Sequence, residues 1–91
     1  MDFVEKVRKN LQGKLHIEDG NCGTTHKVLR EISKLGGKAI VWERPDGVYS
    51  KILDDKGNVV GEGEGITWPP AILFAMVEGG FFPEEIGSEL T

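Results

Sequence analysis

The chain has 91 residues, 38% of them hydrophobic and 29% charged, a composition typical of one globular domain with a single small core. Its formal net charge of −4 disfavours nucleic acid as a partner, because an acidic surface repels phosphate unless the Lys and Arg residues gather on one face. The sequence has one cysteine, and it contains no apolar run of the ~20 residues that span a bilayer. Its N-terminus carries acidic residues where a secretory signal carries basic ones. These features together indicate one cytoplasmic domain over 1–91 with no membrane segment.

The first predicted element is a helix over 2–12. Asp2 is a good N-cap, apolar residues recur at helical spacing behind it, and Gly13 stands where a C-terminal glycine belongs. After this helix, Leu15 and Ile17 favour a short edge strand.

A second helix is predicted after a turn at 19–21, whose residues are Asp, Gly and Asn. Thr24 or Thr25 is expected to cap this helix, because threonine oxygens accept hydrogen bonds from the first amides of a helix. Its apolar stripe runs to Leu35, and the glycine pair at 36–37 ends it.

Three strands of an antiparallel meander are predicted next. The segments 38–44 and 48–53 are rich in β-branched and aromatic residues, and Pro-Asp-Gly at 45–47 forms the turn between them. A second turn at 54–58 leads into a third strand at 59–65.

The last predicted helix opens at Thr67 and runs into the glycine pair at 79–80, and Pro83 followed by two glutamates favours one more helical turn. The order is therefore helix, helix, three-stranded antiparallel meander and helix. This order is an α+β fold in which helices pack on a small sheet.

The third strand has two chemically different faces, because side chains alternate along a strand. One face is expected to carry Val60, Glu62 and Glu64, and the other Val59, Gly61, Gly63 and Gly65. A glycine face allows close approach of another backbone or of a flat ligand. The strand is therefore either packed tightly beneath its own helix or part of a binding surface, and its glutamates oppose a phosphate there.

The last helix has no charged residue over 68–77, so apolar side chains point in every direction around its axis. Either the rest of the chain wraps this helix or a second chain covers it. We expect a homodimer through 70–78 and the aromatic pair at 81–82. The candidate binding residues of the whole chain are Trp42, Tyr49, Glu62, Gly63, Glu64, Trp68, Leu73, Phe74, Phe81 and Phe82.

Catalytic and metal chemistry find little support. Residues 19–22, Asp-Gly-Asn-Cys, resemble the Asp-Gly-x-Cys nucleophile motif of the ovarian-tumour-type deubiquitinases, which implies a thiolate nucleophile at Cys22. That family pairs its cysteine with a histidine far downstream, whereas His16 and His26 are close to Cys22 in sequence. We predict no catalytic residue, no metal ligand and no cofactor.

Two family resemblances bear on the fold. The turn, glycine strand and helix over 54–78 resemble the back half of a double-stranded-RNA-binding domain, but that family has lysines where 66–70 reads Ile-Thr-Trp-Pro-Pro. The arrangement over 24–78 is similar to the small phage-encoded domains described as ABA sandwiches. That similarity implies a small accessory protein of a phage or bacterium that acts by binding.

The leading functional hypothesis is a non-enzymatic protein-binding domain, accessory or inhibitory, that acts through an acidic and apolar surface on a protein partner or on a second copy. The alternative is a small-ligand or nucleotide-binding module that uses the glycine strand and stacks its ligand on Trp42, Tyr49 or Trp68. A Cys-dependent enzyme is the third hypothesis.

Overall fold

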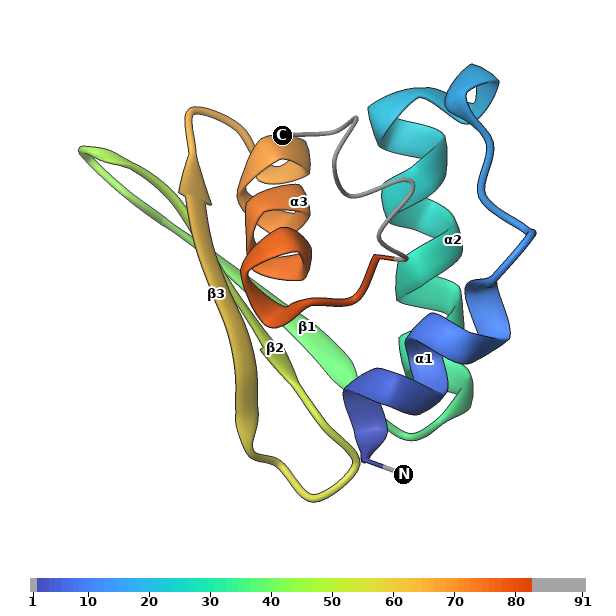
Figure 1. Ribbon diagram of the computed structural model, residues 1–91. Helices are drawn as coiled ribbons and strands as arrows, with labels where there is room; N and C mark the ends of the chain where they lie inside the picture. The colour runs from blue at the N-terminus through green and yellow to red at the C-terminus, as the bar shows by residue number, and fades with distance from the viewer. Residues whose placement is uncertain (1, 83–91) are drawn as a thin grey trace.

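The computed structural model describes residues 2–82 and has the predicted α+β order (Figure 1). The three strands form one antiparallel sheet in the order β1-β2-β3. The elements are α1 (Phe3–Leu11), a 3₁₀ turn (Ile17–Asp19), α2 (Gly20–Lys34), β1 (Lys38–Arg44), β2 (Gly47–Leu53), β3 (Val59–Gly65) and α3 (Trp68–Gly79). The additional turn predicted at Pro83 lies outside the described residues.

The first helix forms as its sequence predicts. The Asp2 carboxylate accepts a hydrogen bond of 2.8 Å from the backbone amide of Glu5, which satisfies one of the free amides at the helix start. Phe3, Val7 and Leu11 recur every four residues and are all buried. The helix therefore turns one apolar face to the core.

The segment between the first two helices differs from its prediction. Leu15 is buried in the core, and the chain forms a 3₁₀ turn at Ile17–Asp19, so the predicted edge strand was wrong. The chain does turn at Gly20, where φ is +69°, a conformation that glycine adopts without a steric penalty. One β-branched residue, Ile17, was too little to specify a strand when the core needed Leu15 from a connecting loop.

The second helix begins at Gly20, four residues before Thr24 and five before Thr25, the two predicted caps. Thr24 and Thr25 are buried inside the helix, and the Thr25 hydroxyl donates a 2.7 Å hydrogen bond to the Asn21 carbonyl oxygen. A threonine that satisfies its hydroxyl on the preceding turn is compatible with a helix interior. The prediction that one of these threonines caps α2 was therefore wrong.

One face of the sheet is covered by the helices and the other is open to solvent. Along β2, Val48, Ser50 and Ile52 are buried beneath the helices, and the residues between them lie on the open face. The register of β2 with β3 shifts between Ile52 and Leu53, and Val60 packs against the core at this irregularity. The predicted alternation of β3 therefore holds from Gly61 onward.

Helix α3 occupies the middle of the molecule, between the sheet and the layer formed by α1 and α2 (Figure 1). This position explains why its sequence is apolar on nearly every side. The buried residues that form the core are Phe3, Val7, Leu11, Leu15, Val28, Ile32, Ile52, Ile72, Leu73, Ala75, Met76, Phe81 and Phe82.

The glycines of β3 allow α3 to approach the sheet at backbone distance. A methyl group built on Gly63 would lie 2.5 Å from the Ala71 carbonyl oxygen, and one on Gly65 would lie 2.9 Å from the Ala71 amide nitrogen. A methyl group on Gly61 would collide with the Ala75 carbonyl oxygen. Of the two interpretations of the glycine face, the close contact with its own helix is therefore confirmed.

Candidate functional site

A groove runs along the free edge of β3, and we call it the β3-edge groove. It takes its lining from three consecutive elements, because α3 packs so closely on β3 that its outward residues reach past the edge of the sheet. The lining residues are Tyr49 of β2, Glu62, Gly63 and Glu64 of β3, and Phe74 and Glu78 of α3.

Glu78 closes one end of the exposed strand edge. Its carboxylate accepts a hydrogen bond of 3.1 Å from the backbone amide of Glu62. Since β3 is an edge strand, this amide has no neighbouring strand to bond, and a side chain from α3 takes that role. The groove is therefore better shaped to receive side chains than to add a further strand at Glu62.

All three charged residues that line the groove are glutamates. Lys51 lies 3.8 Å from the Glu62 carboxylate, but both side chains are largely exposed, so the attraction is weak. Among residues 2–82, neither Glu64 nor Glu78 forms an ion pair. Phe74 is 55% exposed and stands one helical turn before Glu78 on α3. A large apolar ring is thus combined with carboxylates on a surface open to solvent.

Beside the groove, Tyr49 stacks on Trp42 across neighbouring strands, with ring centroids 5.8 Å apart and an interplanar angle of 20°. Cations lie over both rings: the Arg44 guanidinium is 5.1 Å from the Tyr49 centroid, and the Lys51 ammonium is 5.7 Å from the Trp42 centroid. The ring faces that a planar ligand would stack on are therefore already in contact with neighbouring side chains.

The Tyr49 hydroxyl donates a 2.7 Å hydrogen bond to the Asp46 carboxylate. This bond to a negatively charged partner raises the pKa of Tyr49 above its ordinary value of 10.0. The hydrogen bond fixes the ring orientation at the groove margin.

The other predicted binding residues fall into two groups. Leu73, Phe81 and Phe82 are buried in the chain's own core, where α2 and the sheet pack on α3 and Phe81 contacts Phe3 of α1. Trp68 is 56% exposed at the start of α3, outside the lining of the β3-edge groove. The fold therefore brings Tyr49, Glu62, Gly63, Glu64 and Phe74 together, with Trp42 beside them against Tyr49. It places the other predicted residues elsewhere, namely Trp68, Leu73, Phe81 and Phe82.

Sequence reasoning missed two exposed residues. Glu78 completes the acidic lining, and its position four residues after Phe74 was the available signal, since such a pair shares one helix face. Ile66 is 92% exposed in the short link between β3 and α3. Nothing in the local sequence marks an isolated isoleucine in a loop as exposed.

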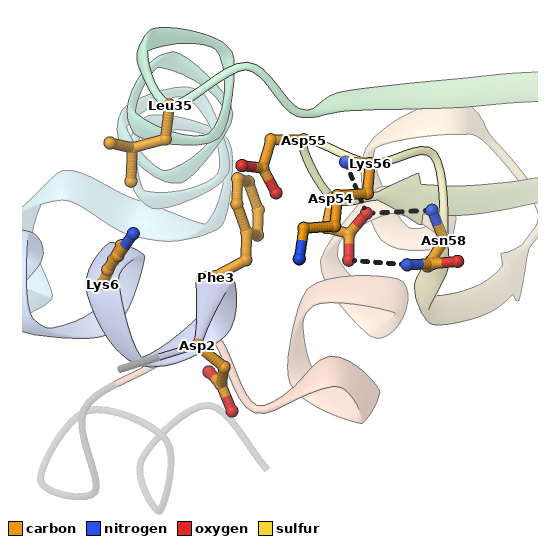
Figure 2. A pocket seen from close by; sticks show the side chains of 8 residues that line it. All are labelled: Asp2, Phe3, Lys6, Leu35, Asp54, Asp55, Lys56 and Asn58. Carbon is orange, nitrogen blue, oxygen red and sulfur yellow. Dashed lines mark hydrogen bonds between the residues drawn. The ribbon is translucent and has the colours of Figure 1, made fainter.

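A second pocket lies where the start of α1, the end of α2 and the β2–β3 turn meet (Figure 2). Charged side chains of both signs approach it, which makes it an alternative candidate site. Its lining residues are Asp2, Phe3, Lys6, Leu35, Asp54, Asp55, Lys56 and Asn58.

Two of the three acidic residues of this pocket, Asp2 and Asp54, already serve the fold. The Asp54 carboxylate accepts hydrogen bonds of 2.9 Å from the backbone amides of Lys56 and Asn58, and Figure 2 shows this closed turn. These bonds, chiefly the one from Asn58, lower the pKa of Asp54 below its ordinary value of 3.8. Asp2 caps α1. We therefore assign this pocket a structural role in joining the turn to the helices.

Cys22 is exposed on the first turn of α2. Within residues 2–82, no group of three or more His, Cys, Asp or Glu side chains is placed to hold a metal ion. None of the helices described combines the length and apolar character needed to cross a membrane.

Comparison of the chain with protein-family models, with curated proteins and with solved structures found no match. The functional argument therefore comes from the chemistry of the surface itself.

Proposed function

We propose that the chain is a small non-enzymatic protein-binding domain whose β3-edge groove receives a Lys- or Arg-bearing segment of another protein. The observation that carries this proposal is the exposed Phe74 ring in a groove lined by the carboxylates of Glu62, Glu64 and Glu78. A long basic side chain fits this combination, because its aliphatic stem packs on the ring while its charged end reaches a carboxylate.

The negative charge of the groove also disfavours anionic partners. A phosphate or a carboxylate ligand would be repelled by three glutamates, of which Lys51 approaches one. Electrostatic attraction of this kind accelerates association with a basic surface more than it raises affinity. The affinity then comes largely from burial of Phe74.

The small-ligand alternative has less support. The glycine face of β3 is covered by α3, which leaves no room there for a flat ligand. Trp42 and Tyr49 stack on one another beneath Lys51 and Arg44, so a nucleobase would have to displace a neighbour. An accessory role in a phage or bacterium, and a cytoplasmic location, stay predictions from the sequence.

The test is affinity purification of the tagged chain from cell extract, followed by mass spectrometry. A groove variant carries Phe74→Ala and Glu64→Gln. The control variant carries the same classes of change at exposed positions outside the groove, Ile66→Ala and Glu43→Gln. We expect the wild type and the control to recover the same basic protein, and the groove variant to lose it.

Titration calorimetry with the purified partner then gives the dissociation constants. Loss of the aromatic anchor and one carboxylate should weaken binding at least about tenfold, which corresponds to roughly 1.4 kcal/mol. Undiminished recovery by the groove variant, or equal weakening in the control, would contradict the proposed site.

A further inference from the structure

The two edges of the sheet are protected to very different degrees. On β3, the Glu78 carboxylate accepts a hydrogen bond from the Glu62 amide, Glu62 and Glu64 are exposed, and the register with β2 is irregular at one end. Charged side chains, irregular register and a covered edge are the devices by which natural sheets prevent further strand pairing. The β3 edge is therefore closed to another strand over much of its length.

The β1 edge has none of these devices in its centre. All seven residues of Lys38–Arg44 pair with β2 in unbroken register, and the strand contains neither proline nor glycine. Ile40 is 43% exposed and Val41 is 39% exposed, and as neighbours in a strand they lie on opposite faces of the sheet. A regular edge strand with an apolar centre exposed on both faces favours pairing with a further strand.

We propose that β1 pairs antiparallel with β1 of a second copy, so that two chains share one six-stranded sheet. A two-fold axis makes the contact self-complementary, because the same apolar centre is presented by both copies. The charged residues Lys38, Glu43 and Arg44 stand at the two ends of the strand, where they leave the centre free to pair.

The charges select the register of this pairing. An axis at Val41 would place Lys38 opposite Arg44 of the partner subunit, and like charges directly opposite are destabilising. An axis at Ile40 instead sets Lys38 opposite the uncharged Trp42 of the partner subunit, so no like charges stand directly opposite one another. In this register Ile40 pairs with Ile40 of the partner subunit across the two-fold axis, and Ala39 pairs with the partner's Val41. We therefore propose the register centred on Ile40.

This dimer is independent of the proposed function, since the β3-edge groove lies at the opposite edge of the sheet. It also differs from association through α3. Leu73 is buried in the chain itself, and Phe74 is the residue in the middle of α3 that an α3-mediated contact would use.

The test is the mass of the purified chain by multi-angle light scattering from micromolar to millimolar concentration. We expect a concentration-dependent mass that approaches twice the 10.0 kDa of one chain. Val41→Lys should raise the dimer dissociation constant at least about tenfold, because two lysines would meet near the axis. Val59→Lys is the matched control, since Val59 is 48% exposed on the other edge strand, and it should leave the constant unchanged.

A second measurement does not depend on a variant. In a sample that mixes isotope-labelled and unlabelled chains, nuclear Overhauser contacts between Ala39 and the partner's Val41 are expected at high concentration. A monomeric mass across the whole range would overturn the proposal. So would a dimer that survives Val41→Lys but is lost on Phe74→Glu, which would place the contact on α3.

Discussion

Gly63 of β3 and Ala71 of α3 are in direct backbone contact, since a methyl group on Gly63 would lie 2.5 Å from the Ala71 carbonyl oxygen. The neighbour that would have to move is helix backbone, which has no alternative rotamer. We expect Gly63→Ala to destabilise the fold by roughly 3 kcal/mol, at the upper end of the usual cost of overpacking. Urea unfolding followed by circular dichroism measures this loss.

The control for this change is Gly23→Ala in the interior of α2. A methyl group there would lie 3.3 Å from the Asp19 Cβ, a contact that a backbone shift of a few tenths of an ångström at the start of α2 relieves. Alanine is favoured over glycine in a helix by about 1 kcal/mol, so this variant should be neutral or more stable. Similar losses in both variants would show that the contact of β3 with α3 is not the cause.

Ser50 offers a stability gain. Its hydroxyl is buried at 1% exposure beneath α3 and has no hydrogen-bond partner within residues 2–82. Removal of an unpaired buried hydroxyl is expected to leave stability unchanged or to raise it by up to about 1 kcal/mol in Ser50→Ala. Thr25→Val is the comparison, because the Thr25 hydroxyl is bonded, and it should cost about 1 kcal/mol. A loss of that size in Ser50→Ala would indicate a bound water.

Asp19 should make stability depend on acid pH. Its carboxylate accepts hydrogen bonds from Lys27 at 2.7 Å and from the His16 amide at 2.9 Å, and these lower its pKa below 3.8, the Lys27 bond most. A carboxyl group whose pKa is lower in the folded state stabilises the fold above the unfolded value and loses this contribution as the pH falls through the folded pKa. Asp19→Asn should therefore lower Tm at pH 7.

The difference in Tm between wild type and Asp19→Asn should begin to shrink below about pH 4, where the carboxyl group of the unfolded chain takes up a proton, and should be smallest below the lowered pKa of the folded state. Thermal unfolding by circular dichroism across pH 2 to pH 7 measures this, with Glu18→Gln as a neighbouring control. A difference that stays constant with pH would mean that the substitution acts through geometry and not through charge.

Cys22 should be dispensable. It is exposed on the first turn of α2, so Cys22→Ser removes no packing and is expected to change stability by less than about 0.5 kcal/mol. Partner recovery in the affinity purification should also be unchanged. Loss of recovery in a variant that unfolds normally would revive a role for the thiol.

Duplex RNA and DNA should show no measurable binding at physiological salt, because the net charge is −4 and the start of α3 lacks lysine. Fluorescence anisotropy with labelled duplexes is the measurement. A salt-dependent complex in the micromolar range would mean that the basic residues act together on one face.

The strands and the first and last helices were predictable because their signals are local. The turn at Asp54 and the glycine positions of β3 are each indicated by a pattern of only a few consecutive residues. The start of α2 was not predictable in this way, since it depends on a positive φ at Gly20 and on an ion pair between Asp19 and Lys27, eight residues apart.

Five of the six residues that line the groove were among the predicted binding residues, but their arrangement was not predictable. A helix without a polar stripe does not reveal which side faces solvent, so Leu73 and Phe74 looked equivalent in sequence. The position of α3 between two layers buries Leu73 and exposes Phe74. The same packing carries Glu78 to the edge of β3, which no local pattern indicates.

The glycine contact between β3 and α3 also bears on how the chain folds. The two elements are joined by the two residues Ile66 and Thr67, so bringing them together closes a very short loop and loses little chain entropy. We expect this unit to be structured in the folding transition state, with α1, which must close onto the far end of the chain, joining later. Folding rates of Gly63→Ala should then slow in proportion to its loss of stability, whereas Val7→Ala should mainly accelerate unfolding.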